Sequence, residues 1–95
     1  MRNITHSSGN VFRDLGFPEA EAANLALRAD LIAALAKVLA KRGVTQRQWA
    51  SELGITQARV SDILRGNTSR FSLDKLVNLL SRAGQRVKVR VVRRS

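Results

Sequence analysis

The chain has 95 residues, of which 17 are Lys or Arg and 7 are Asp or Glu, so its formal net charge at pH 7 is +10. A length near 100 residues predicts one domain and argues against a large active-site cleft between two domains. So strong a positive charge favours a polyanionic partner, either nucleic acid or an anionic membrane, and a basic surface without any partner is the plainer alternative.

Cysteine and histidine are too scarce for most metal or redox chemistry. The chain has no cysteine and one histidine, which argues against a disulfide framework and a zinc site. His6, Ser7 and Ser8 are consecutive and so do not form a catalytic triad, and no Gly-rich phosphate loop is present. We therefore predict that the protein is not an enzyme and takes no cofactor and no metal.

Neither a membrane span nor a secretory signal is predicted. The first ten residues are polar, and no run approaches the ~18 apolar residues that a span requires. We expect a cytoplasmic protein with no membrane partner.

Residues 1–17 are predicted to form a flexible N-terminal arm followed by a short turn. The arm is polar and shows no hydrophobic periodicity. Asn10 can cap a turn through Val11, Phe12 and Leu15.

Residues 18–84 are predicted to form the helical domain. Its first helix begins at Pro18, carries acidic residues in its first turn, and ends in two basic residues before Gly43. Its many Ala and Leu residues predict one long helix, or two helices joined near residues 28–30.

Three shorter helices follow, each beginning after a Ser or Thr that can cap it and ending near a glycine. They are predicted over residues 46–53, 57–65 and 73–83.

Residues 85–95 are predicted to form a β-strand and a basic tail. Val87, Val89 and Val91 alternate with Lys88 and Arg90, which is the pattern of a half-buried strand. A single chain offers this strand no partner, so we expect it to pair with a second copy, or else with a partner protein's sheet or the N-terminal arm. The predicted fold is therefore mainly α, a bundle of about five helices with one C-terminal β-strand.

The stretch TQRQWASELGITQARVSDILRGN, residues 45–67, has the spacing of a helix-turn-helix. Ala50 provides the small side chain needed where the helices cross, and Gly54 tolerates the positive φ of a tight turn. Stacking of Trp49 on a base is less favoured than a core position. The residues predicted to face the core are Trp49, Leu53, Ile55, Val60 and Ile63.

If Val60 and Ile63 face inward, helical spacing places polar residues on the opposite face of the second helix. Gln can bind adenine with two hydrogen bonds, Ser can bond several bases, and Ala can contact a thymine methyl. A hairpin with a purely structural role would more typically carry Glu and Lys. The pattern therefore favours contact with DNA base edges by this face, which carries Gln57, Ala58, Ser61, Asp62 and Arg65.

Residues 31–84 resemble the lambda-repressor-like, Cro/XRE type of helix-turn-helix regulators, through the motif QRQWASELGITQARVSDILRG. The whole chain, from GNVFRDLGF through FSLDKL to the terminal Val residues, resembles the compact branch that includes antitoxins of the HigA type. The resemblance implies a lambda-repressor-like bundle that binds double-stranded DNA.

The resemblance also implies roles for individual residues. Gln46 and the loop over residues 66–70, with Asn67 and Arg70, would hold phosphates. Thr56 would cap the second helix and meet the DNA backbone. The candidate DNA-binding residues are Gln46, Thr56, Gln57, Ala58, Arg59, Ser61, Asp62, Arg65, Asn67 and Arg70.

Asp62 departs from the family pattern, in which a basic or amide residue often follows the Ser. It could accept a hydrogen bond from cytosine N4. We favour an ion pair with Arg59 or Arg65, because a carboxylate facing phosphate is repelled.

The predicted function is sequence-specific binding of double-stranded DNA by a homodimer that represses transcription from a near-palindromic operator, with the protein then associated with the nucleoid. The alternative is an antitoxin that neutralises a small RNase toxin by direct contact, and the two roles are compatible. General RNA binding is disfavoured, because three Phe and one Trp provide no stacking platform.

Overall fold

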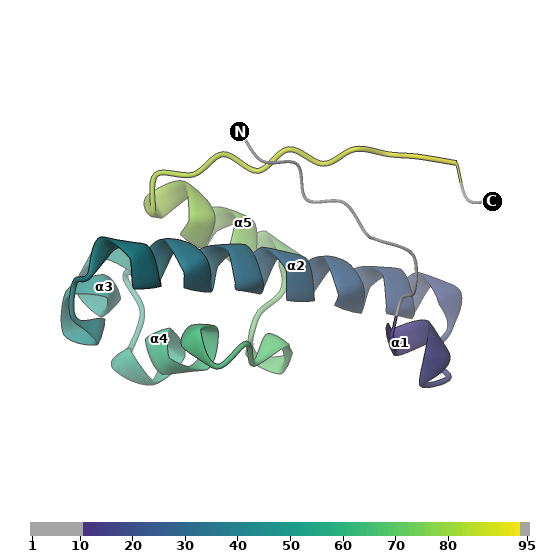
Figure 1. Ribbon diagram of the computed structural model, residues 1–95, viewed down its shortest axis with the longest axis horizontal. Helices are drawn as coiled ribbons and strands as arrows, with labels where there is room; N and C mark the ends of the chain where they lie inside the picture. The colour runs from purple at the N-terminus through teal and green to yellow at the C-terminus, as the bar shows by residue number, and fades with distance from the viewer. Residues whose placement is uncertain (1–10, 94–95) are drawn as a thin grey trace.

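The computed structural model describes residues 11–93, which contain five α-helices and one short 3-10 helix (Figure 1). The predicted arm over residues 1–9, with His6, lies outside the described residues, as do residues 94 and 95. The mainly helical fold predicted from the sequence is confirmed. The elements are α1 Val11–Asp14, α2 Glu19–Arg42, α3 Gln46–Leu53, α4 Gln57–Leu64, η1 Thr68–Arg70 and α5 Leu73–Arg82.

Helix α2 is the axis on which the other elements pack. It runs unbroken for 24 residues, so the alternative of two helices joined near residues 28–30 is wrong. Glu19 and Glu21 lie in its first turn, and Gly43 ends it with a φ of 70°. In Figure 1, α3 and α4 lie on one side of α2, and α5 with the C-terminal segment lies on the other.

The core joins the C-terminal half of α2 to the three helices that follow. Leu35 of α2, Val60 of α4 and Leu76 of α5 have no exposed surface. Burying one such side chain stabilises the fold by about 1.5–3 kcal/mol relative to leaving it in water. The other fully buried large side chains are Leu31, Ile32, Trp49, Leu53, Ile63 and Leu79.

The predicted C-terminal β-strand is wrong, because residues 85–93 contain no strand and none occurs elsewhere in residues 11–93. Val87 packs on the core, but Val91 is 93% exposed. Alternating Val and basic residues determine which side chains share a face. They do not supply the second strand whose backbone N–H and C=O groups a strand needs.

Among residues 11–93, no helix combines the length and hydrophobicity that crossing a bilayer requires.

Candidate nucleic-acid interface

Helices α3 and α4 and the turn between them form a helix-turn-helix whose ends are defined by local hydrogen bonds. Thr45 Oγ1 accepts from the Gln48 N–H at 3.1 Å, and Gln48 Oε1 accepts from the Thr45 N–H at 3.0 Å, a reciprocal cap that starts α3. Thr56 Oγ1 accepts from the Arg59 N–H at 3.2 Å and starts α4, as predicted. The sequence therefore encodes both helix starts locally.

The turn requires glycine at position 54. Gly54 has a φ of 69°, and the Ile55 N–H that follows it donates to the Ala50 carbonyl at 3.0 Å. A Cβ on Gly54 would lie 2.8 Å from Arg82 Nη1, which reaches over from α5. The positive φ therefore favours glycine here, and a larger residue would also displace the end of the flexible Arg82 side chain.

The inner face of the helix-turn-helix is locked to α2, as the sequence predicts. Trp49, Leu53, Val60 and Ile63 are buried, and Ile55 packs on the same core. Trp49 donates from Nε1 to the Leu39 carbonyl at 3.2 Å. Trp49 is therefore a core residue, and the alternative that it stacks on a base is wrong.

The outer face of α4 carries the residues predicted to contact bases. Gln57 and Ala58 are exposed and Ser61 is half-buried. Within residues 11–93, no hydrogen bond occupies the side chain of Gln57 or Ser61. Both side chains are therefore available to a ligand that covers this face.

Asp62 lies at the centre of a polar network and is only 4% exposed. Arg59 Nη1 donates to its Oδ2, and Arg65 Nη2 donates to its Oδ1 at 2.6 Å. Asn67 Nδ2 donates to the same Oδ1 at 3.4 Å. The predicted ion pair is confirmed with both arginines, and the carboxylate is turned away from the exposed face of α4.

The network orients the two arginine side chains and lowers the pKa of the Asp62 carboxyl. Desolvation raises the pKa of the Asp62 carboxyl, but the hydrogen bonds from Arg65, Arg59 and Asn67 outweigh it, so the pKa lies below its ordinary value. One carboxylate balances only one of the two arginines. Asp62 and the two arginines together thus keep a net positive charge, and the hydrogen bonds hold this charge in a defined orientation beside the outer face of α4.

We expect Asp62→Asn to make the fold less sensitive to acid. A lowered folded-state pKa contributes stability above the unfolded-state pKa of about 3.9, and this stability is lost as the pH falls through the folded-state pKa. Between about pH 7 and pH 2, the free energy of unfolding should therefore fall less in Asp62→Asn than in the wild type. Urea denaturation across this range measures the difference. Asp14→Asn, which removes an exposed carboxylate of α1, is the control, and an equal effect of the two changes would contradict this role.

The residues predicted to hold phosphates border α4 on two sides. Gln46 is exposed at the first position of α3, and Arg70 is exposed at the end of η1, which packs on α4. Asn67 is half-buried, and its Oδ1 accepts from Ser69 Oγ at 2.8 Å. The side chain of Asn67 therefore forms hydrogen bonds to Asp62 and within the loop, and it is only partly exposed.

The sequence prediction omitted one exposed cation, Arg47, which lies in the first turn of α3 beside Gln46. A basic residue next to a predicted phosphate contact was the available signal. Arg47 adds positive charge near the N-terminus of α3, where the helix dipole also favours an anion.

Comparison with known proteins identifies one family. A family model described as a helix-turn-helix domain matches residues 11–92. No curated protein and no solved structure matches the chain significantly. The match covers the whole described helical region and most of the extended segment that follows it.

Proposed function

Because the chain belongs to the helix-turn-helix domain family, we propose that it is a transcriptional repressor of the Cro/XRE type that binds its operator as a homodimer. A helix-turn-helix domain supports a role in DNA binding. The repressor activity, the subtype and the dimer are parts of the proposal.

The exposed face of α4 is the observation that carries this proposal. Gln57, Ala58 and Ser61 would contact base edges, because Thr56 fixes the start of α4 and the buried Val60 and Ile63 turn the opposite face outward. Structural roles leave these three side chains unused. The face therefore has the chemistry of base recognition.

Affinity and specificity come from different residues in this mechanism. Gln46, Arg47 and Arg70 are exposed around α4 and would bind phosphates without regard to sequence. Arg59 and Arg65, held by Asp62, add positive charge beside the recognition face. Release of counterions then supplies affinity, and the α4 face supplies discrimination between sequences.

A homodimer follows from the small size of one recognition helix. Helix α4 has 8 residues and can contact only a few base pairs. Two copies related by a two-fold axis would place two such helices about 34 Å apart, on adjacent turns of a near-palindromic operator. Occupying an operator that overlaps a promoter would repress transcription.

Gln57→Ala should weaken binding to the cognate operator by about 1–3 kcal/mol and weaken binding to random DNA far less, because it removes a base contact. Arg70→Ala should weaken both about equally, because it removes a phosphate contact. Paired gel-shift titrations of the two variants on both DNAs separate these effects.

The matched control for Gln57→Ala is Gln85→Ala, which alters an exposed glutamine outside the helix-turn-helix and should leave both affinities unchanged. If Gln57→Ala and Arg70→Ala reduce the ratio of operator affinity to random-DNA affinity by the same factor, the assignment of the α4 face is wrong.

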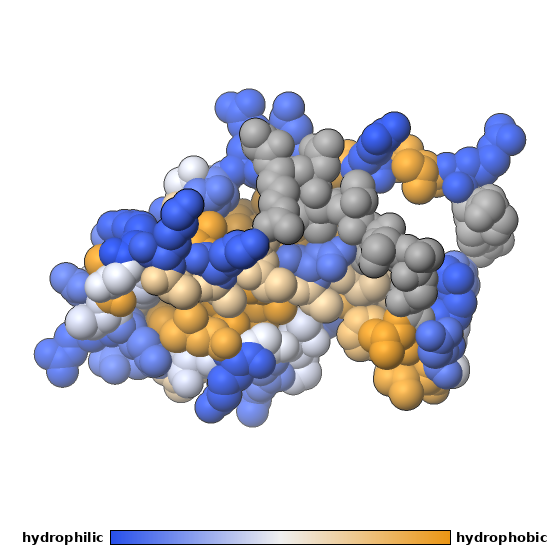
Figure 2. All heavy atoms as spheres, in the orientation of Figure 1, coloured by the Kyte–Doolittle hydropathy of each residue, from blue (hydrophilic) through white to orange (hydrophobic). Residues whose placement is uncertain are grey.

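A second candidate function is that of an antitoxin, which would bind a small RNase toxin and also regulate its own operator. The observation in its favour is the exposed apolar surface at the α1 end of the molecule (Figure 2). Leu15 is 71% exposed and Val11 56% exposed. Exposed apolar groups of this kind are typical of protein interfaces.

The antitoxin role is tested by co-purification with the product of the neighbouring open reading frame. Leu15→Glu should abolish this association and leave DNA binding intact. An association that survives the change would place the toxin contact elsewhere.

A further inference from the structure

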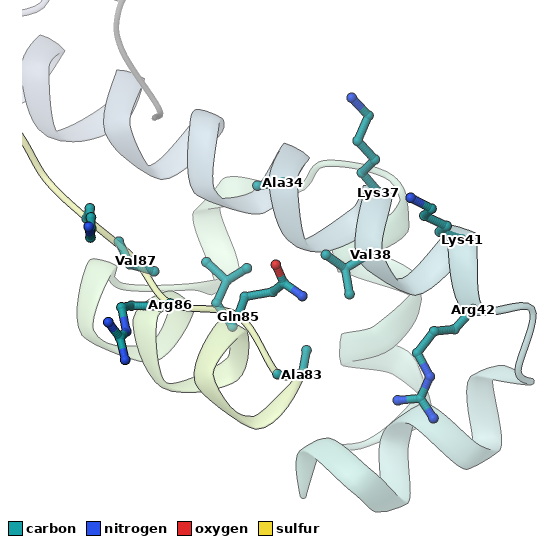
Figure 3. A pocket seen from close by; sticks show the side chains of 12 residues that line it. Ala34, Lys37, Val38, Lys41, Arg42, Ala83, Gln85, Arg86 and Val87 are labelled. Atoms are coloured by element: carbon teal, nitrogen blue, oxygen red, sulfur yellow. The ribbon is translucent and has the colours of Figure 1, made fainter. Parts of the chain in front are cut away.

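A groove lies between the C-terminal half of α2, the end of α5 and the start of the C-terminal segment (Figure 3). Its volume of about 590 Å³ is within the range of small-molecule sites. In Figure 3, Val38 of α2 and Val87 of the C-terminal segment lie on opposite sides of it, and the side chain of Gln85 extends between them. Apolar groups form its floor, namely Ala34, Val38, Leu80, Ala83 and Val87.

The charged residues that line this groove are all cationic, and Gln85 adds a neutral amide. Lys37, Lys41 and Arg42 come from α2, and Arg86 and Lys88 come from the C-terminal segment. No Asp or Glu is among the lining residues, so the lining carries five positive charges and no negative one. An apolar floor with a cationic rim complements a molecule that has an apolar body and an anionic group.

Arg42 belongs both to this groove and to the helix-turn-helix. Its guanidinium carbon lies 4.5 Å from the centroid of the Trp49 ring, and its Nη1 donates to Glu52 Oε2 at 3.3 Å. In Figure 3, Arg42 extends from α2 toward α3, the helix that carries both partners. An anion in the groove would compete with Glu52 for Arg42 and so change the surroundings of Trp49.

We propose that the groove binds a small apolar carboxylate and that Arg42 connects its occupancy to α3. The apolar chain of the ligand displaces water from the floor between Val38 and Val87, and the carboxylate balances the charge of Lys37 and Lys41. No residue of α4 lines the groove. A ligand in the groove therefore leaves the outer face of α4 uncovered.

The chain contains its own reporter for this site. Trp49 is the only tryptophan and there is no tyrosine, so intrinsic fluorescence reports the surroundings of Trp49 alone. The probes are straight-chain fatty carboxylates of increasing length, each titrated into the full chain below its micellar concentration. We expect a saturable change in Trp49 emission, with affinity rising up to about fourfold for each added CH₂ until the groove is filled.

Two sets of controls separate the apolar and the charged contributions. Primary alcohols of the same chain lengths lack the carboxylate and should bind roughly tenfold more weakly. The double variant Lys37→Gln and Lys41→Gln should weaken carboxylate binding by a similar factor. Lys75→Gln, which removes an exposed α5 cation that does not line the groove, should leave the affinity unchanged.

Val38→Asp places a carboxylate on the floor and should abolish binding, with thermal melting by circular dichroism verifying that the variant is folded. The proposal is overturned if no chain length gives a saturable change, if alcohols bind as tightly as carboxylates, or if the double lysine variant binds like the wild type. Binding to anionic lipid vesicles without binding to monomeric carboxylates overturns it too, because the surface would then be a membrane-contact patch.

Discussion

The affinity of this protein for its operator is expected to fall with a slope of roughly −5 to −9 in a plot of log K against log salt concentration. The estimate assumes about three to five neutralised phosphates for each protomer of the proposed dimer and about 0.9 released counterions for each phosphate. Between about 50 and 200 mM salt, the affinity would drop by about 10³- to 10⁵-fold. The net charge of +10 and the exposed cations around α4 are the physical basis of this expectation.

Fluorescence anisotropy of labelled operator DNA, measured over a salt series, gives this slope. Arg70→Ala should make it shallower by about 2 for a dimer, because each protomer loses one phosphate contact. Gln57→Ala should leave the slope unchanged, because a base contact releases no counterion. A wild-type slope near zero would exclude the proposed mechanism.

Trp49→Ala should lower the free energy of unfolding by about 3–5 kcal/mol, the typical cost of removing a large buried aromatic side chain. The indole is 2% exposed, bonds the Leu39 carbonyl through Nε1, and lies beneath the Arg42 guanidinium. Alanine would leave a cavity between α2 and α3 and an unpaired carbonyl. Since Trp49 anchors α3 to α2, operator binding should weaken together with stability.

Urea denaturation followed by circular dichroism measures this loss, because the variant has no tryptophan to fluoresce. Trp49→Phe is the matched control. It keeps an aromatic ring and loses the hydrogen bond, so its cost should be clearly smaller. A loss below about 1 kcal/mol for Trp49→Ala would show that the position is not an anchor of the core.

Several features of the fold could be predicted from sequence because short-range interactions determine them. Thr45, Thr56 and Ser72 each accept a hydrogen bond from a backbone N–H three residues later, so the cap and the helix it starts lie in one short segment. Gly43 and Gly54 end helices through their own positive φ. The ion pairs of Asp62 follow from helical spacing, since Arg59 and Arg65 are three residues away on either side.

The C-terminal segment shows where such reasoning fails. The alternation of Val and basic residues over residues 87–91 is as regular as in a real strand, yet the segment forms none within residues 11–93. A strand depends on hydrogen bonds to another segment, and local periodicity carries no information about a partner.

The sequence by itself thus determined where helices begin and end and which of their faces are apolar. Only the tertiary structure decided that Asp62 is buried, that Arg42 lies over Trp49, and that residues 34–42 and 80–88 enclose a cationic groove. The physical reason is the range of the interactions. Caps, turns and helical periodicity act within a few residues, whereas these contacts depend on how distant helices pack against one another.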